Sequence, residues 1–401
     1  MKHIFLILIL WQSSNVYCQN RRIQFDTISN WAKLKSRAAE EKKLLFVDCY
    51  TTWCGPCKLM DKNVFTNDTV ADFFNKNFIN ARRDMEKGEG KLILQEFRVE
   101  AFPTYLFIDG SGKLVHRGCG SSGAKAFVQK GMDALTPEKQ LVGMTNKYGS
   151  GNRDAAFLLQ YIHVLSDAAL PEDEVVSAYF QTQAEKDLTS RSNWKTIQNY
   201  TRSIDSSEFK YLSSHQKEFA KLYTEDSVKM KLEGTYKMNA FSILFAKKFD
   251  KTAFDKIKNE IRETELPKKD AILNSLDLEQ ASHEKQWDKY CELAIAYCKK
   301  YSWNETGFLN NTAYQMQDVT NDKKFLEGAL ELAKRSVELK EESYNSDTYA
   351  SVLYKLKRFD EALKTEIKAL ELAKKEGHED TKGYQDFILK IKNEIAMNKK
   401  Q

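Results

Sequence analysis

The sequence predicts an α/β fold, with a central mixed sheet flanked by helices, followed by an all-helical region. Between about residues 22 and 135, short apolar runs alternate with helical stretches, which is the pattern of a layered α/β domain. After Pro137 the strand signals almost vanish. We expect a signal peptide at 1–18, the α/β domain at 19–136, a helical region at 137–280 and helical repeats at 281–401. The length of 401 residues suits roughly two to three domains.

The composition excludes several classes of protein. Hydrophobic residues make up 42% and charged residues 30%, which is ordinary for a soluble globular chain. The net charge is only +5, and no basic run is interleaved with aromatic residues, so we expect no nucleic-acid partner. Beyond the N-terminus, no apolar run reaches the ~18 residues that a membrane-spanning helix needs.

The N-terminus has the pattern of a secretory signal. A short positive start precedes the apolar run Ile4–Trp11 and the polar stretch Gln12–Cys18, with Val16 and Cys18 at the −3 and −1 positions of a cleavage site. We therefore expect export, most simply to a bacterial periplasm or cell envelope, where disulfides are permitted. A lipid-attached Cys18 is the alternative, although Tyr17 stands where a lipobox has a small residue.

The α/β part contains four strand signals and five helical stretches. The strands are predicted at Leu44–Cys49, Phe78–Ala81, Thr104–Ile108 and Leu114–Arg117. The helices are predicted at Ser29–Lys43, Pro56–Asn63, Thr69–Asn77, Lys91–Phe97 and Ala124–Ala134, with Asn67 and Asp68 as an N-cap region for the third.

After Pro137, the pattern of apolar residues predicts helices that are joined by polar connections. Examples are Phe157–Ser166, Asp173–Ala184, Ser214–Tyr223, Ala253–Glu263 and Lys285–Lys300. Near the C-terminus, Ala362 and Ala369 are seven residues apart, and Ala329 and Ser336 hold the same spacing 33 residues upstream. This period resembles a tetratricopeptide repeat, in which small residues let paired helices approach closely. An ordinary amphipathic bundle is the alternative.

The reactive chemistry is expected at Trp53-Cys54-Gly55-Pro56-Cys57. A dithiol exchange site needs two close thiols, one of them exposed and acidified, and a Cys-x-x-Cys at a helix start supplies this arrangement. Pro56 suits the first helical turn, where its missing N–H costs nothing. The motif follows a predicted strand and opens a predicted helix, which is the context that such a site requires.

Three separated elements resemble the thioredoxin family. They are Asp48 six residues before the first cysteine, the Trp53–Cys57 motif itself, and the segment Phe102-Pro103-Thr104 at the start of a strand. The likeness covers about residues 26 to 134 and extends to the exported thioredoxin-like domains of disulfide-interchange reductases. It implies a thioredoxin fold for this part of the chain.

The resemblance also implies roles for the thiols and the acid. Cys54 would be the nucleophile that attacks a substrate disulfide, and Cys57 would be the more buried, resolving thiol. Asp48 would lie beneath Cys57 and help to move its proton. The lysine that partners this acid in the family has no confident match in this chain.

For substrate binding, the resemblance implies a second set of residues. Pro103 would be a cis-proline facing the thiols, and the Phe102 backbone would pair with an extended substrate. Trp53 would shield the motif, and Gly118 would border the substrate groove.

Other interpretations of these residues are possible. A zinc site is disfavoured because no second Cys-x-x-Cys exists and the six histidines are scattered, so we expect neither a metal nor a cofactor. The Cys54–Cys57 pair could instead be a non-exchanging structural disulfide, Asp48 could face solvent, and Pro103 could be trans. Cys49 is expected to be a buried strand residue. Cys119 is either a bystander or a reactive thiol beside the groove.

Cys291 and Cys298 lie two helical turns apart, about 10 Å along the axis, which is too far for a disulfide within one helix. We expect them to pack in the helical region.

Two functions are consistent with these patterns. The first is an exported thiol–disulfide oxidoreductase that reduces or interchanges protein disulfides through Cys54 and Cys57, with a membrane-embedded electron donor and clients docked on the helices. Because Cys-Gly-Pro-Cys, by resemblance, goes with reductants near about −270 mV, we expect the reducing direction. The second is an interaction protein that works through repeat-like helices, with the first domain as an accessory or a redox switch.

Overall fold

The computed structural model describes residues 21–378 and 380–398, so the signal peptide expected at 1–18 lies outside the described residues. The chain forms two compact units that divide between Thr201 and Arg202. No helix in the described part of the chain is long and apolar enough to cross a membrane. Export stays a prediction.

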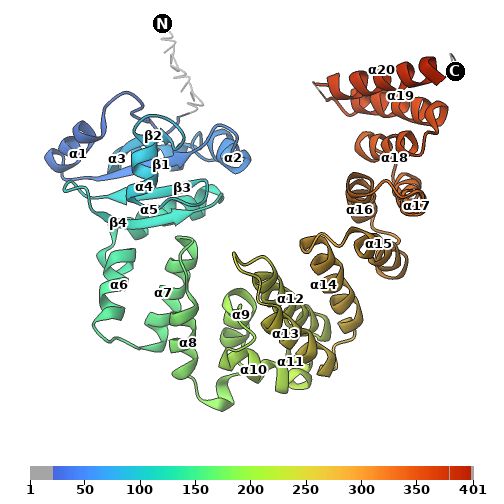
Figure 1. The fold of residues 1–401 in the computed structure, drawn as a ribbon. Coiled ribbons are helices and arrows are strands. Elements are labelled where there is room, and N and C mark those ends of the chain that lie inside the picture. Colours follow the sequence, from blue (N-terminus) through green and yellow to red (C-terminus); the bar gives the residue numbers. More distant parts are fainter. Residues whose placement is uncertain (1–20, 379, 399–401) are drawn as a thin grey trace, which may run out of the picture. The chain divides into compact units, whose positions relative to one another are not determined.

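The first unit contains a mixed four-stranded sheet (Figure 1), and the fold class expected for this part is confirmed. Its strand order is β2-β1-β3-β4, with β1 parallel to β2, and β3 antiparallel to both β1 and β4. The strands are β1 (Leu44–Tyr50), β2 (Phe78–Asp84), β3 (Thr104–Ile108) and β4 (Leu114–Cys119).

Helices cover both faces of this sheet. One core contains Phe46, Phe74 and Phe127, and the other contains Leu34, Val47 and Ile93. Alternate residues of each strand supply the two cores, as the period of two in a strand requires. The helices are α1 (Trp31–Glu40), α2 (Gly55–Asn63), α3 (Asp68–Asn77), α4 (Gly90–Glu96) and α5 (Ala124–Leu135).

Two local details of this unit bear on the predictions. The Asn67 side chain caps α3 by accepting from the backbone N–H groups of Thr69 and Val70, as expected. The strand predicted to end at Ala81 continues instead to Asp84. Its last residues are charged, but they pair in register with the end of β1, and this pairing overrides their low strand propensity.

The first unit also includes helices that follow the sheet. They are α6 (Leu141–Gly149), α7 (Ala155–Asp167), α8 (Asp173–Gln181) and α9 (Arg191–Tyr200). Both α6 and α7 contact β4 (Figure 1). The Leu141 N–H donates to Nδ1 of His116 on β4 across 3.1 Å, and Lys130 on α5 pairs with Asp167 on α7.

The second unit is entirely helical in its described residues, as expected. It contains α10 (Ser207–Ser214), α11 (Gln216–Leu222), α12 (Glu225–Leu244), α13 (Lys251–Glu263), α14 (Lys269–His283), α15 (Trp287–Tyr301), α16 (Thr306–Val319), α17 (Lys323–Leu339), α18 (Ser343–Lys355), α19 (Phe359–Lys375) and α20 (Lys382–Asn398).

The helix predicted at Ser214–Tyr223 corresponds to α11, which begins two residues later than expected, because Ser214 is the last residue of α10. The Ser214 hydroxyl donates to the Lys210 and Tyr211 carbonyl oxygens. Such side-chain bonds compete with the helical ladder and favour an end at this point.

Small residues lie where the C-terminal helices pair. Ala329, Ser336, Ala362 and Ala369 are all fully buried, and α17 and α19 pack closely on α16 and α18. A small side chain at each position lets the two backbones approach. The tetratricopeptide-like repeat itself stays a prediction.

Candidate active site

The cysteine motif lies where β1 leads into α2. Cys54 is the N-cap residue of α2, and its sulfur accepts a hydrogen bond of 3.1 Å from the Cys57 N–H. Pro56 lies in the first turn of the helix. Cys54 and Cys57 are joined by a disulfide, with their Cα atoms 5.3 Å apart. In the reduced form, the helix N-terminus would stabilise a thiolate on Cys54.

The two cysteines are equally buried, each with 3% of its surface exposed. The expected greater burial of Cys57 is therefore absent in this disulfide form. The reason is local, because the Cys54 sulfur is held against the backbone of the first helical turn by the Cys57 N–H.

The Trp53 side chain lies beside the motif and is 64% exposed. Its indole N–H donates to Glu86 across 3.0 Å, and its ring meets Phe102 edge-on at 5.9 Å. Trp53 therefore links the cysteine motif to the segment that contains Pro103.

Asp48 is buried on β1, with only 1% of its surface exposed. Burial is the main cause that raises the pKa of this carboxyl, to about 7. The nearby Arg82 opposes the rise, and the Asp61 carboxylate adds to it. A buried acid with a pKa near neutrality can both accept and return a proton under physiological conditions.

Arg82 is the site residue that sequence reasoning missed. It stands in register with Asp48 on the neighbouring strand, and its Nε lies 2.9 Å from Oδ2 of Asp48. Its Nη1 lies 2.9 Å from Oδ1 of Asp61, and its guanidinium lies over the Tyr50 ring at 4.3 Å. An arginine therefore supplies the cation for which the sequence offered no confident lysine. The sequence shows Arg82 as a charged residue four positions after Phe78, the first residue of β2. Parallel pairing of β1 and β2 places it opposite Asp48.

The segment around Pro103 completes the site. The Phe102–Pro103 peptide bond is cis, and Thr104 begins β3 directly after it. Phe102 makes no backbone–backbone hydrogen bond to another described residue, and its pairing with an extended substrate stays a prediction. The Gly120 N–H donates to the Pro103 carbonyl oxygen across 2.8 Å, which ties the loop after β4 to this segment.

Comparison with known proteins shows the family to which the residues around this site are similar. A family model described as thioredoxin-like matches residues 26–110. Thioredoxin H-type 1 of Nicotiana tabacum is 34% identical over 96 residues, which are 23% of this chain and 69% of that protein. The chain belongs to the thioredoxin family.

Two further matches come from other thioredoxin-like proteins. The thiol:disulfide interchange protein DsbD of Photorhabdus laumondii is 26% identical over 105 residues, covering 26% of this chain and 18% of that protein. A solution structure of a candidate disulphide-isomerase from Bacteroides thetaiotaomicron is 45% identical, covering 29% of this chain and 97% of that one, with a TM-score of 0.28. The chain spans only 64% and 60% of the lengths of two other thioredoxins that it matches.

The fold and the bonded cysteine pair are those of the thioredoxin family, and they are consistent with thiol–disulfide exchange. The roles that the resemblance implies stay predictions for all of the named site residues: Cys54, Cys57, Asp48, Trp53, Phe102, Pro103 and Gly118. Gly118 lies on β4, and a Cβ built there would meet Lys130 Cδ at 3.1 Å and an Asp167 oxygen at 3.2 Å. Its bordering of the substrate groove stays a prediction.

The other cysteines in the described part of this thioredoxin-family chain are free thiols: Cys49, Cys119, Cys291 and Cys298. Cys49 is buried, and burial raises the pKa of its thiol well above the ordinary range. Cys119 is half-buried, with its sulfur 3.6 Å from the Thr104 hydroxyl. Burial also raises the pKa values of Cys291 and Cys298 to about 11, which makes both poor nucleophiles.

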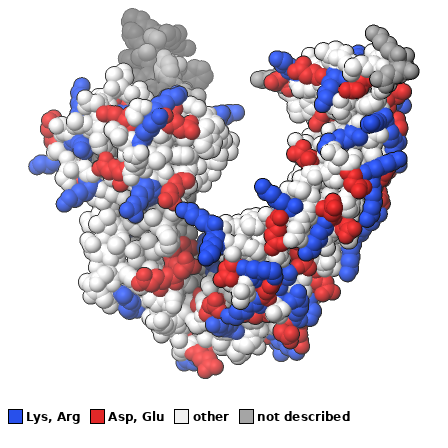
Figure 2. Space-filling model, viewed as in Figure 1, with Lys and Arg blue, Asp and Glu red and all other residues white. Residues whose placement is uncertain are grey.

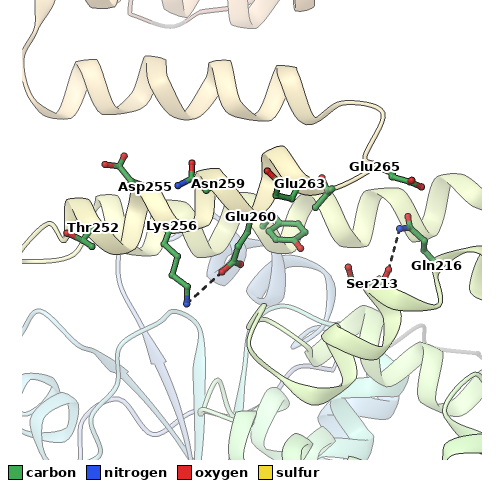
Figure 3. Close-up of a pocket in the computed structure, with 11 residues that line it drawn as sticks. Ser213, Gln216, Thr252, Asp255, Lys256, Asn259, Glu260, Glu263 and Glu265 are labelled. Carbon is green, nitrogen blue, oxygen red and sulfur yellow. Dashed lines mark hydrogen bonds and ion pairs between the residues drawn. The ribbon is translucent and has the colours of Figure 1, made fainter.

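No group of three or more histidine, cysteine or acidic side chains among the described residues could hold a metal ion. A large groove of about 910 Å³ lies along α13 in the second unit (Figure 3). Its carboxylates are partly neutralised, since Lys256 lies 3.8 Å from Glu260. None of the described residues that line this groove is a cysteine.

Proposed function

We propose that this protein is an exported thiol–disulfide oxidoreductase that reduces or interchanges disulfides of client proteins through Cys54 and Cys57. The observation that carries the proposal is the disulfide between these two residues at the start of α2, the helix that follows the strand carrying the buried Asp48. The helical region would dock clients or partners. The relative named as a thiol:disulfide interchange protein supports the same class of reaction.

In the reducing direction, the Cys54 thiolate attacks one sulfur of a client disulfide, and the other client sulfur leaves as a thiolate. Cys57 then loses its proton to Asp48 and attacks the Cys54 sulfur. This second step breaks the mixed disulfide, re-forms the Cys54–Cys57 bond and releases the client as a dithiol. The client gains two electrons and the protein loses two.

Each turnover therefore leaves the protein oxidised, and a dithiol donor must reduce it again. For an exported protein we propose a membrane-embedded reductase as that donor. The Cys-Gly-Pro-Cys sequence supports the reducing direction, because thioredoxin itself has a potential of about −270 mV.

The reduction potential of the full mature chain tests this proposal. The protein is equilibrated with dithiothreitol or glutathione buffers, and the thiols are trapped and counted, with Cys54→Ser as the control that cannot form the bond. We expect a reversible two-electron couple near about −250 mV or below. A potential above about −150 mV would make the protein a disulfide donor, and an irreducible bond would make it structural.

A further inference from the structure

A groove of about 550 Å³ lies in the first unit, and the loop after β4, which is bonded to the Pro103 segment, lines part of it. Its walls come from α5 and α7, its floor from β4, and its upper end from the loop between β4 and α5. Building on the proposed function, we propose that this groove binds an extended, uncharged stretch of the client chain next to the client's reactive cysteine.

The loop after β4 connects the groove to the redox site. The Gly120 N–H bonds to the Pro103 carbonyl oxygen, and the Ser122 N–H points to the Met60 sulfur at 3.3 Å. Met60 belongs to α2, the helix that begins at the cysteine motif. Ser121 and Ser122 of the same loop also line the groove. A chain that leaves the Pro103 segment in an extended form therefore meets the groove directly across this loop.

The charges in the groove are already neutralised. Lys130 and Asp167 face each other from opposite walls and form an ion pair. Asp133, which also lines the groove, lies 3.4 Å from Lys139. Because these charges are paired within the protein, a charged client segment would gain little there and would lose hydration.

A hydrogen-bond donor lies at the floor of the groove. His116 is only 3% exposed, and its Nδ1 accepts the Leu141 N–H at 3.1 Å. The neutral ring therefore carries its proton on Nε2. This N–H has no hydrogen-bond partner among the described residues, so it can bind a carbonyl oxygen of a peptide backbone.

The occupant is therefore a polypeptide rather than a small disulfide. A volume near 550 Å³ is within the range of ligand pockets and can hold several residues of an extended chain. The groove would raise the rate with protein clients and leave small disulfides dependent on the cysteine site alone.

The test uses the full mature chain with its cysteine pair reduced. The probes are cysteine peptides carrying a thionitrobenzoate group on sulfur, one a capped single residue and one with about five alanine, serine or threonine residues on each side, long enough to span about 17 Å per side. Attack by Cys54 on the peptide sulfur releases coloured thionitrobenzoate. Each protein molecule reacts once, because no donor is added, so the measured quantity is the ratio of the second-order rate constant for the long probe to that for the short probe.

We expect a ratio well above one in the natural protein, and Ala126→Trp, which fills the groove from the exposed wall of α5, to lower it by about fivefold or more. Met132→Trp, on the same helix but outside the groove, is the matched control and should keep the ratio. Gln129→Trp is the second groove variant, used if Ala126→Trp does not fold.

Equal ratios in Ala126→Trp and the natural protein would overturn the groove proposal, as would a ratio of one in the natural protein. A faster reaction with lysine-flanked or glutamate-flanked probes would contradict the proposal that the groove binds an uncharged segment. Failure of the natural protein to release thionitrobenzoate from either probe would instead contradict the proposed function.

Discussion

Arg82 contacts two carboxylates and an aromatic ring, and its charge affects the pKa of Asp48. Its guanidinium lies between the carboxylates of Asp48 and Asp61 and over the ring of Tyr50. An arginine is always charged, so it lowers the pKa of Asp48 without itself becoming a proton donor. The pKa of Asp48 still stays near 7, because burial outweighs the nearby cation. A pKa in this range is what the proposed proton exchange with Cys57 requires.

The raised pKa of Asp48 predicts how stability depends on pH. Between about pH 4 and pH 7 the folded protein holds a proton that the unfolded chain has released, so the free energy of unfolding falls as pH rises through this range. Asp48→Asn removes this titration. At pH 8 we expect the oxidised variant to be more stable than the natural protein by on the order of 1–4 kcal/mol, with a smaller difference at pH 5.

Urea unfolding of the oxidised proteins at the two pH values measures this difference. Asp72→Asn is the control, because Asp72 is an exposed carboxylate that pairs with Arg21 and does not affect the pKa of Asp48. If Asp48→Asn changed stability equally at pH 5 and pH 8, the raised pKa would be wrong.

At the scale of the elements, the redox site was predictable from sequence and its cation was not. The cysteine motif, Asp48 and Pro103 stand next to runs whose apolar pattern already predicts strands and a helix. Arg82 lies in a charged stretch that looks like the end of a strand. Only the parallel register of β2 against β1 brings Arg82 beside Asp48, and register is set by pairing across the sheet rather than by local sequence.

The pair α18 and α19 contains a second buried acid. Glu366 on α19 is fully buried, and burial together with the Asp347 carboxylate on α18 raises the pKa of Glu366 to about 9. The folded form therefore keeps a proton that the unfolded chain releases above about pH 4.5, and the stability of these helices falls as pH rises towards 9.

Glu366→Gln should remove this dependence. We expect its melting temperature at pH 8.5 to exceed that of the natural protein by several degrees, with a smaller gap at pH 5. Thermal unfolding followed by circular dichroism at the two pH values measures the effect. Glu371→Gln, on the same helix but outside the buried set, is the control. A gap that did not grow with pH would show that Glu366 is ionised in the folded protein.

At the scale of the whole molecule, the first unit extends beyond the thioredoxin-like residues. The helices α6 to α9 belong to the same compact unit as the sheet. The boundary expected at residue 136 follows a change in sequence pattern, but packing is not visible in that pattern. His116 bonds to Leu141 of α6, and Lys130 pairs with Asp167 of α7. The sequence around His116 and Lys130 does not predict either contact.

A comparison of two pieces of the chain tests this extension. Residues 19–136 lack Leu141 and Asp167, whereas residues 19–201 contain them. We expect the shorter piece to melt at a lower temperature. Burial lowers the pKa of His116 to about 4 in the complete unit, and in the shorter piece it should return towards 6.5. Nuclear magnetic resonance titration of the histidine rings measures this pKa, and equal values in the two pieces would contradict the packing described here.

The packing of α6 and α7 against β4 affects how the edge of the sheet can meet other polypeptide chains (Figure 1). An open strand at the edge of a sheet is a template for aggregation, and reduced clients expose strands of their own. Here α6 and α7 pack against β4, and the segment around Asp26 pairs with the outer side of β2. Charges of both signs are also interspersed over the visible surface (Figure 2). Both edge strands of the described sheet are thus covered in part, which leaves less open strand edge for the proposed clients to pair with.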